Sequence, residues 1–367
     1  MAAASAGGRS HPSSRGGEAT RERGHDMRRR TFLTGLGAFG AMGLVGCGSK
    51  SENGYVADPG SLQVYSAQHE NLTKAWVEAF TAATGIKVQV RKGSDASMGH
   101  QIVAEGSASP ADVFLTENSP AMTLVERNKL LAPLDEETRR QVPANLAPSS
   151  NAWTSIAARS TVLVYNTAKL DKADLPKSLM DLAGPHWKGR WGCAPGGADF
   201  QAIVAGMLAG QGEQKTSDWL DGLKSNARVL QNNIATMKSV NAGEIACGVI
   251  YHYYWYRDQA GTKEGSANTA LHYFRNQDPG AFVSLSGGAV LARTKKPAEA
   301  QKFLTFITSK AGQQVLVDSQ SMEYAVGSGV ASAPALPPLD SLQAPPVDPF
   351  TLNSDKVNEL MTDAGII

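Results

Sequence analysis

Four polar side chains occupy positions from which they could bind one ligand. Each follows a predicted strand: His69 comes after residues 62–66, Glu117 after 111–116, and Tyr253 and Tyr254 after 246–251. In open α/β sheets, ligands bind outside the carboxyl ends of the strands. The sequence therefore predicts that an imidazole, a carboxylate and two phenols converge at one edge of the sheet.

The donor atoms of this group suit a small, hard and highly charged cation. Imidazole nitrogen, carboxylate oxygen and two phenolate oxygens favour an ion such as Fe³⁺ over one that prefers thiolates. Because a phenol has an ordinary pKa of about 10, the cation must itself drive the ionisation of both tyrosines and release their protons. Two phenolates and one carboxylate would then balance the three positive charges of the ion.

Each of these residue types also has an ordinary structural role. A histidine at a helix start is more often a cap or a surface residue, and a tyrosine pair in an aromatic run such as 251–256 more often packs in a core. Both tyrosines can reach one ligand only from a turn or a helix start, because neighbouring residues of a strand point to opposite faces. The site at this edge of the sheet could instead hold an organic anion, a polyamine or a thiamine-like cation, and the tyrosine rings could stack on such a cation.

The segments around these side chains predict an α/β fold. In the first half, apolar spacing predicts strands at 62–66, 86–90 and 111–116, separated by helices at 70–84 and 98–105. This β-α-β-α-β order is typical of a sheet with helices on both faces. Beyond an irregular stretch, a second α/β unit is expected, with strands at 161–165, 190–194 and 246–251 and a helix at 200–209.

The last part of the chain predicts four further features. They are an apolar stretch at 283–292 around Gly287 and Gly288, one long helix at 298–317, an extended proline- and alanine-rich segment at 331–349, and a short helix near the C-terminus.

The sequence carries none of the common enzyme signatures. It has no G-x-S-x-G elbow, no Walker loop, no H-E-x-x-H and no G-x-G-x-x-G that opens a helix after a strand. A metalloenzyme would need an open coordination position and a second catalytic group, and His100, His186 and His272 have no spacing typical of ligands. We therefore expect a binding protein rather than an enzyme.

Residues 1–46 have the pattern of an export signal. Arg29 and Arg30 precede a short apolar stretch, as in twin-arginine signals, and residues 44–47 resemble a lipobox that ends at Cys47. We expect Cys47 to be acylated and residues 47–61 to form a linker from the lipid to the fold. An uncleaved anchor with a chance cysteine is the alternative, and translation could begin at Met27.

The composition agrees with a globular, exported protein. The chain has 367 residues, 42% of them hydrophobic, only 3 Cys and a net charge of +1, which excludes a disordered tail, a disulfide scaffold and a nucleic-acid partner. Without residues 1–46, which contain seven Arg and three acidic residues, the formal charge becomes about −3.

Several motifs of the mature chain resemble those of the ferric-ion-binding proteins of bacterial iron ABC transporters. They are residues 64–69, 110–117, Arg159 with 162–166, 253–256, and 276–281 before Ser286 and Gly287. The resemblance implies a two-lobed, periplasmic-binding-protein-like α/β fold of the class II type, with two crossover strands at the hinge. It also implies that His69, Glu117, Tyr253 and Tyr254 hold Fe³⁺.

The same resemblance implies an organisation and a set of partners. Lobe 1 would comprise residues 62–158 and about 285–331, and lobe 2 residues 159–284 and about 332–367. We expect a monomer at the outer face of the cell membrane, held there by its lipid anchor, that delivers iron to an ABC permease and its ATPase.

An exogenous anion completes the iron site in some of these proteins. The resemblance assigns it to Arg159, Asn233 and the backbone of Gly197 and Ala198, where N–H groups at a helix start could bind phosphate or carbonate. The chain departs from the family pattern here, because residues 196–199 are Gly-Gly-Ala-Asp where many members have a Ser or Asn followed by Gly. Asp199 would also repel an anion unless it turns away.

Cys193 and Cys247 both fall in predicted strands of the second unit. In an oxidising compartment they could form a disulfide that stabilises the fold by roughly 4 kcal/mol. Alternatively, they are two buried, unpaired apolar side chains.

Overall fold

A computed structural model describes residues 55–367, in which nine strands are joined by hydrogen bonds. The predicted export signal, most of the linker and Cys47 lie outside the described residues. The strand order is β2-β1-β3-β9-β4-β7-β5-β6, and β8 pairs with β4. The strands are β1 Leu62–Ser66, β2 Val88–Lys92, β3 Val113–Leu115, β4 Thr154–Asn166, β5 Trp191–Cys193, β6 Ala227–Val229, β7 Cys247–Tyr251, β8 Thr269–His272 and β9 Val283–Val290.

Eleven α-helices accompany these strands within residues 55–367. They are α1 Glu70–Thr84, α2 Asp95–Glu105, α3 Ser119–Arg127, α4 Glu136–Arg140, α5 Ala198–Gln211, α6 Glu213–Asn226, α7 Asn233–Asn241, α8 His252–Ala260, α9 Pro297–Thr308, α10 Lys310–Asp318 and α11 Ser354–Asp363. No helix among the described residues is long and apolar enough to cross a membrane.

Helices cover both faces of the first part of the sheet, as predicted. Leu62 and Val64 of β1 pack with Trp76 of α1, whereas Tyr65 on the opposite face packs with Ile102 of α2. Because side chains alternate along a strand, one apolar strand contributes to a core on each side. Separate clusters form around β5 and β7 with α5 and α6, and between β4 and α7.

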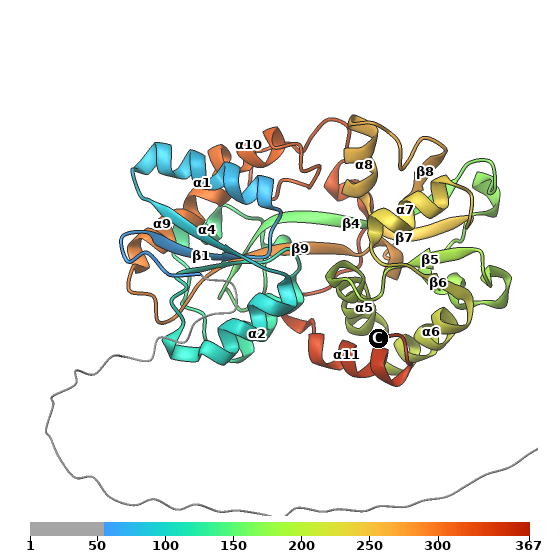
Figure 1. Ribbon diagram of the computed structural model, residues 1–367, viewed down its shortest axis with the longest axis horizontal. Coiled ribbons are helices and arrows are strands. Elements are labelled where there is room, and N and C mark those ends of the chain that lie inside the picture. Colours follow the sequence, from blue (N-terminus) through green and yellow to red (C-terminus); the bar gives the residue numbers. More distant parts are fainter. Residues whose placement is uncertain (1–54) are drawn as a thin grey trace, which may run out of the picture. The chain divides into compact units, whose positions relative to one another are not determined.

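Strand β4 links the two parts of the fold. Its first half, from Thr154 to Ser160, pairs antiparallel with β9, and its second half, from Thr161, pairs with β7 and β8. Strand β9 also pairs with β3. Figure 1 shows β4 and β9 side by side between α1, α2 and α9 on one side and α5 to α8 on the other. The prediction of a two-lobed fold with two crossover strands is confirmed.

The long helix predicted at 298–317 is two helices. Thr308 ends α9, and Ser309 adopts an extended conformation (φ −66°, ψ 166°). The Ser309 hydroxyl accepts a hydrogen bond from the backbone N–H of Gly312 and so caps the start of α10. A Cβ at Gly312 would lie 2.2 Å from the Phe306 carbonyl oxygen, so the close turn requires glycine. The apolar spacing continues through the break, which explains why the pattern did not reveal it.

Cys193 and Cys247 do not form the disulfide that the sequence analysis considered for them. Both thiols are free and buried, and in the parallel pairing Cys247 lies opposite Trp191 rather than Cys193. Burial raises the pKa of Cys247 to about 12, so this thiol stays protonated. The two residues serve as small apolar side chains of the core.

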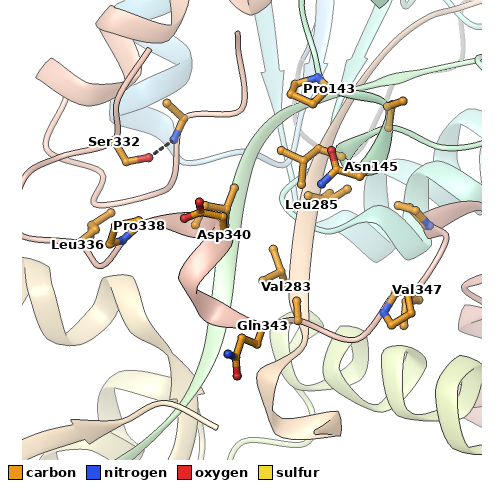
Figure 2. Close-up of a pocket in the computed structure, with 18 of the residues that line it drawn as sticks. Pro143, Asn145, Val283, Leu285, Ser332, Leu336, Pro338, Asp340, Gln343 and Val347 are labelled. Carbon is orange, nitrogen blue, oxygen red and sulfur yellow. Dashed lines mark hydrogen bonds between the residues drawn. The ribbon is translucent and has the colours of Figure 1, made fainter. Parts of the chain in front are cut away.

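A cavity of about 1080 Å³ lies on the face of β9 away from the polar site. Val283 and Leu285 line it together with the loop 143–149 and the segment 330–349 (Figure 2). Residues 331–349, which were predicted to be extended, contain only short 3₁₀ turns. The alternate side chains of β9, Ser284 and Ser286, form hydrogen bonds on the opposite face. The strand therefore separates an apolar cavity from the polar cluster described next.

Candidate metal centre

The four predicted ligands come together from three places where a strand is followed by a helix. His69 is the N-cap residue of α1, directly after β1, and Glu117 lies between β3 and α3. Tyr251 ends β7 and caps α8, so Tyr253 and Tyr254 lie in the first turn of that helix. The sequence analysis required a turn or a helix start here, because two neighbouring tyrosines of a strand could not face one site. The structure has a helix start at this position.

Contacts between these side chains connect the two parts of the fold. Tyr253 Oη donates to Glu117 Oε1 at 3.0 Å, and His69 Nε2 lies 3.4 Å from the same carboxylate oxygen. The ring centres of Tyr253 and Tyr254 are 4.2 Å apart. Adjacent donors of an octahedral ion with bonds of about 2.1 Å lie about 3 Å apart, so these side chains are already close to the spacing that such an ion needs.

Asp199 is a member of this cluster that the sequence analysis did not assign as a ligand. Its Oδ2 accepts hydrogen bonds from Tyr253 Oη at 3.2 Å and from Tyr254 Oη at 3.0 Å. Its Oδ1 accepts from Asn118 Nδ2 at 3.0 Å. Although we expected this carboxylate to matter only by repelling an anion, it points into the site, where it adds a fourth oxygen donor.

One signal in the sequence could have identified Asp199. It stands in the first turn of α5, directly after Gly197 and Ala198, the residues to which the resemblance assigned an anion. An acidic residue at an anion position can supply the negative charge itself. The helix start stabilises such a carboxylate, because the free N–H groups carry partial positive charge.

The side chains assigned to an exogenous anion already bind carboxylates of the chain. Asn233 Nδ2 donates to Asp199 Oδ2 at 2.8 Å, and Arg159 Nη2 donates to Glu323 Oε2 at 2.6 Å. Gly197 is the N-cap residue of α5, and its N–H donates to the Ala194 carbonyl.

Burial favours the neutral form of every titratable side chain in the cluster. It raises the pKa of Asp199 to about 6, with a further contribution from the nearby Glu117 charge, and it raises the pKa of Glu117 itself. It also raises the pKa of both tyrosines and lowers the pKa of His69. A cation that binds here must therefore displace protons, and its affinity will fall as the pH falls.

The phenols distinguish this site from a metal site made of conventional side chains. Within residues 55–367, no group of three or more His, Cys, Asp or Glu residues has the arrangement of a metal site. The cluster instead depends on two tyrosines, and His69 Nε2 is buried without a hydrogen-bond partner. A buried, unpaired imidazole nitrogen among oxygen donors fits a hard cation.

A two-lobed α/β fold with a buried donor cluster beside the crossover strands defines a solute-binding protein. The chain belongs to the family of bacterial extracellular solute-binding proteins, whose sequence profile matches residues 108–350. It is 57% identical over 311 residues to the Fe(3+)-binding periplasmic protein of Serratia marcescens, covering 85% of this chain and 92% of that protein.

Two further comparisons agree with this family. The chain is 36% identical over 308 residues to the major ferric iron-binding protein of Neisseria meningitidis serogroup B, which covers 83% of this chain and 93% of that one. Iron-bound HitA from Pseudomonas aeruginosa superimposes with a TM-score of 0.78 at 42% identity, covering 84% of this chain and all of the other.

Proposed function

We propose that this protein captures Fe³⁺ with His69, Glu117, Tyr253, Tyr254 and Asp199, and carries it without catalysing a reaction. The observation that supports this most strongly is that Tyr253 donates to the half-buried Glu117 and to the buried Asp199, and that Tyr254 donates to the same Asp199 oxygen. Once ionised, the two phenolates and two carboxylates exceed the charge of Fe³⁺ by one negative charge. This excess favours an ion of high charge over divalent competitors.

Asp199 takes the place of the exogenous anion in this proposal. Asn233, the amide assigned to that anion, donates to Asp199, so a phosphate or carbonate has no free side-chain amide there. Iron binding should therefore not depend on added phosphate or carbonate.

The test uses the colour of iron phenolates. Purified protein titrated with Fe³⁺ should develop a visible charge-transfer band, weakened in Tyr253→Phe and in Tyr254→Phe and absent from the double variant. Tyr256→Phe is the matched control, because Tyr256 lies on the same helix and its hydroxyl accepts from Tyr273 rather than contacting the site. A wild-type protein that stays colourless and binds no Fe³⁺ would exclude the function.

The relatives and the N-terminal sequence support a proposal for the location and partners of the protein. The Serratia relative is named as a periplasmic protein, and residues 27–47 of this chain resemble a signal with a lipobox. We infer that the protein is exported, anchored through acylated Cys47, and active as a monomer that delivers iron to an ABC permease and its ATPase. Lobe 1 would comprise residues 62–158 and about 285–331, and lobe 2 residues 159–284 and about 332–367.

A further inference from the structure

A fully buried ion pair lies beside the proposed iron site. Arg159 of β4 and Glu323 of the segment after α10 have no exposed side-chain surface, and Arg159 Nη2 lies 2.6 Å from Glu323 Oε2. The backbone holds the pair in place, because Tyr324 donates its N–H to the Ala158 carbonyl at 2.8 Å and accepts the N–H of Ala158 at 3.0 Å. The segment that carries Glu323 is thus bound directly to a crossover strand.

This pair contacts one proposed ligand from each part of the fold. Glu323 Oε1, which has no hydrogen-bond partner, lies 3.5 Å from His69 Nε2. The Arg159 guanidinium carbon lies 5.7 Å from the centre of the Tyr253 ring. Gln68, next to His69, completes the group by donating its amide to Glu323 Oε2 at 3.4 Å. One carboxylate therefore connects the hinge strand with the imidazole.

The buried guanidinium would by itself oppose iron binding. A positive charge in a medium of low permittivity repels a trivalent cation strongly, and breaking a buried ion pair leaves that charge uncompensated. Glu323 is the only carboxylate of the described residues whose oxygen lies within 4 Å of a nitrogen of Arg159. Its charge offsets that of Arg159, and its second oxygen remains directed at His69.

We propose that Glu323 is a positioning residue of the iron site, which neutralises Arg159 and keeps a negative charge 3.5 Å from His69 Nε2 without being a ligand. This inference rests on the proposed function. In the metal-free protein, Glu323 Oε1 faces the imidazole without a hydrogen bond. When Fe³⁺ binds to His69 Nε2, Glu323 stays paired with Arg159. The positive charge of Arg159 is then neutralised and does not lower the affinity for the ion.

The experiment compares loss of iron from wild type and Glu323→Gln. The loaded proteins are mixed with excess EDTA, and the decay of the phenolate band is followed over time. Partners of metal ligands typically change metal affinity by 10- to 100-fold, so we expect Glu323→Gln to lose iron about ten times faster or more. The double variant Arg159→Met/Glu323→Gln, which removes both charges, should recover most of the wild-type retention.

Asp112→Asn is the matched control, because Asp112 is also a buried carboxylate, bonded to the backbone N–H of Gln63, but lies outside the cluster. It should keep wild-type retention even where stability falls. Wild-type retention in Glu323→Gln, or a double variant no better than the single one, would overturn the inference. A colourless wild type would instead overturn the proposed function.

A second measurement covers the case in which Glu323→Gln does not fold. Glu323→Asp keeps the negative charge but shortens the side chain by one methylene, so its contact with His69 is lost. In the metal-free protein, the ¹⁵N chemical shift of His69 Nε2 should then differ from that of wild type, and iron should be lost faster. An unchanged shift together with unchanged retention would contradict a positioning role.

Discussion

Asp199 is the side chain whose role changed most between the sequence and the structure. Taken alone, an acidic residue next to an expected anion position suggests repulsion. The structure shows that it accepts hydrogen bonds from both proposed phenol ligands, because the start of α5 directs its side chain to the start of α8. Arg159 changed in the same way, from an anion-binding residue to half of an internal ion pair.

The raised pKa of Asp199 predicts how the stability of the metal-free protein depends on pH. The folded-state pKa is about 6, above the ordinary value of 3.8, so folding favours the protonated acid. Its contribution is fully present below pH 3.8 and is lost as the pH rises through about 6. The loss amounts to roughly 3 kcal/mol between pH 4 and pH 7.

In metal-free Asp199→Asn, this part of the pH dependence should disappear. Urea unfolding at a series of pH values measures it, and the advantage of wild type over the variant should shrink as the pH rises from 4 to 7. Asp171→Asn, a change at an exposed carboxylate, should leave the pH profile as it is. Parallel profiles for wild type and Asp199→Asn would show that the folded protein does not hold a protonated Asp199.

At the scale of elements, short helices and loops hold the ligands where strands end. Asp95, the first residue of α2, accepts the backbone N–H groups of Glu117 and Asn118, each at 2.8 Å. It thereby fixes the turn between β3 and α3 on which Glu117 stands. The sequence predicted helix and strand separately, but not this bond between them, because it joins residues 22 positions apart.

Asp95→Ala should therefore weaken iron binding without removing a ligand. By the usual effect of residues that orient metal ligands, we expect about a ten-fold loss of Fe³⁺ affinity in a competition titration against citrate. Ser94→Ala is the control on the same helix: it removes the N-cap contact to Ser97 and costs about 1 kcal/mol of stability, but leaves the Glu117 turn intact. Equal affinities in both variants would argue against the orienting role.

At the scale of the whole molecule, the ligands are divided between the two parts that β4 and β9 connect. His69 and Glu117 follow strands β1 and β3, whereas Asp199, Tyr253 and Tyr254 belong to helices α5 and α8. We expect an ion bound by both sets to favour a closed form, in which the two parts lie together, over an open one.

We expect iron to make the protein more compact and more resistant to heat. Small-angle scattering with and without Fe³⁺ should show a smaller radius of gyration for the loaded protein. At an iron concentration 100 times the dissociation constant, stabilisation should reach about 2.7 kcal/mol, visible as a higher Tm. The double variant Tyr253→Phe/Tyr254→Phe should show neither change, and identical scattering of loaded and free wild type would contradict closure.

The proposed lipid anchor would also be a property of the whole molecule. In cells, the wild type should sediment with membranes and carry acyl chains on Cys47, detectable by mass spectrometry of its N-terminal peptide. Cys47→Ser should lose the acyl chains and the membrane association while its folded part still binds iron. A soluble wild type with an unmodified Cys47 would exclude the anchor.

The sequence by itself determined the class of fold and placed His69, Glu117, Tyr253 and Tyr254 at strand ends. These features depend on local periodicity and on the rule that ligands bind where strands of an α/β sheet end. Only the tertiary structure decided the break at Ser309, the free thiols of Cys193 and Cys247, and the roles of Asp199 and Glu323. The contacts of these two carboxylates join segments up to 255 residues apart, from Gln68 to Glu323. Local patterns carry no information about such contacts, because burial and charge pairing are set by which segments meet after folding.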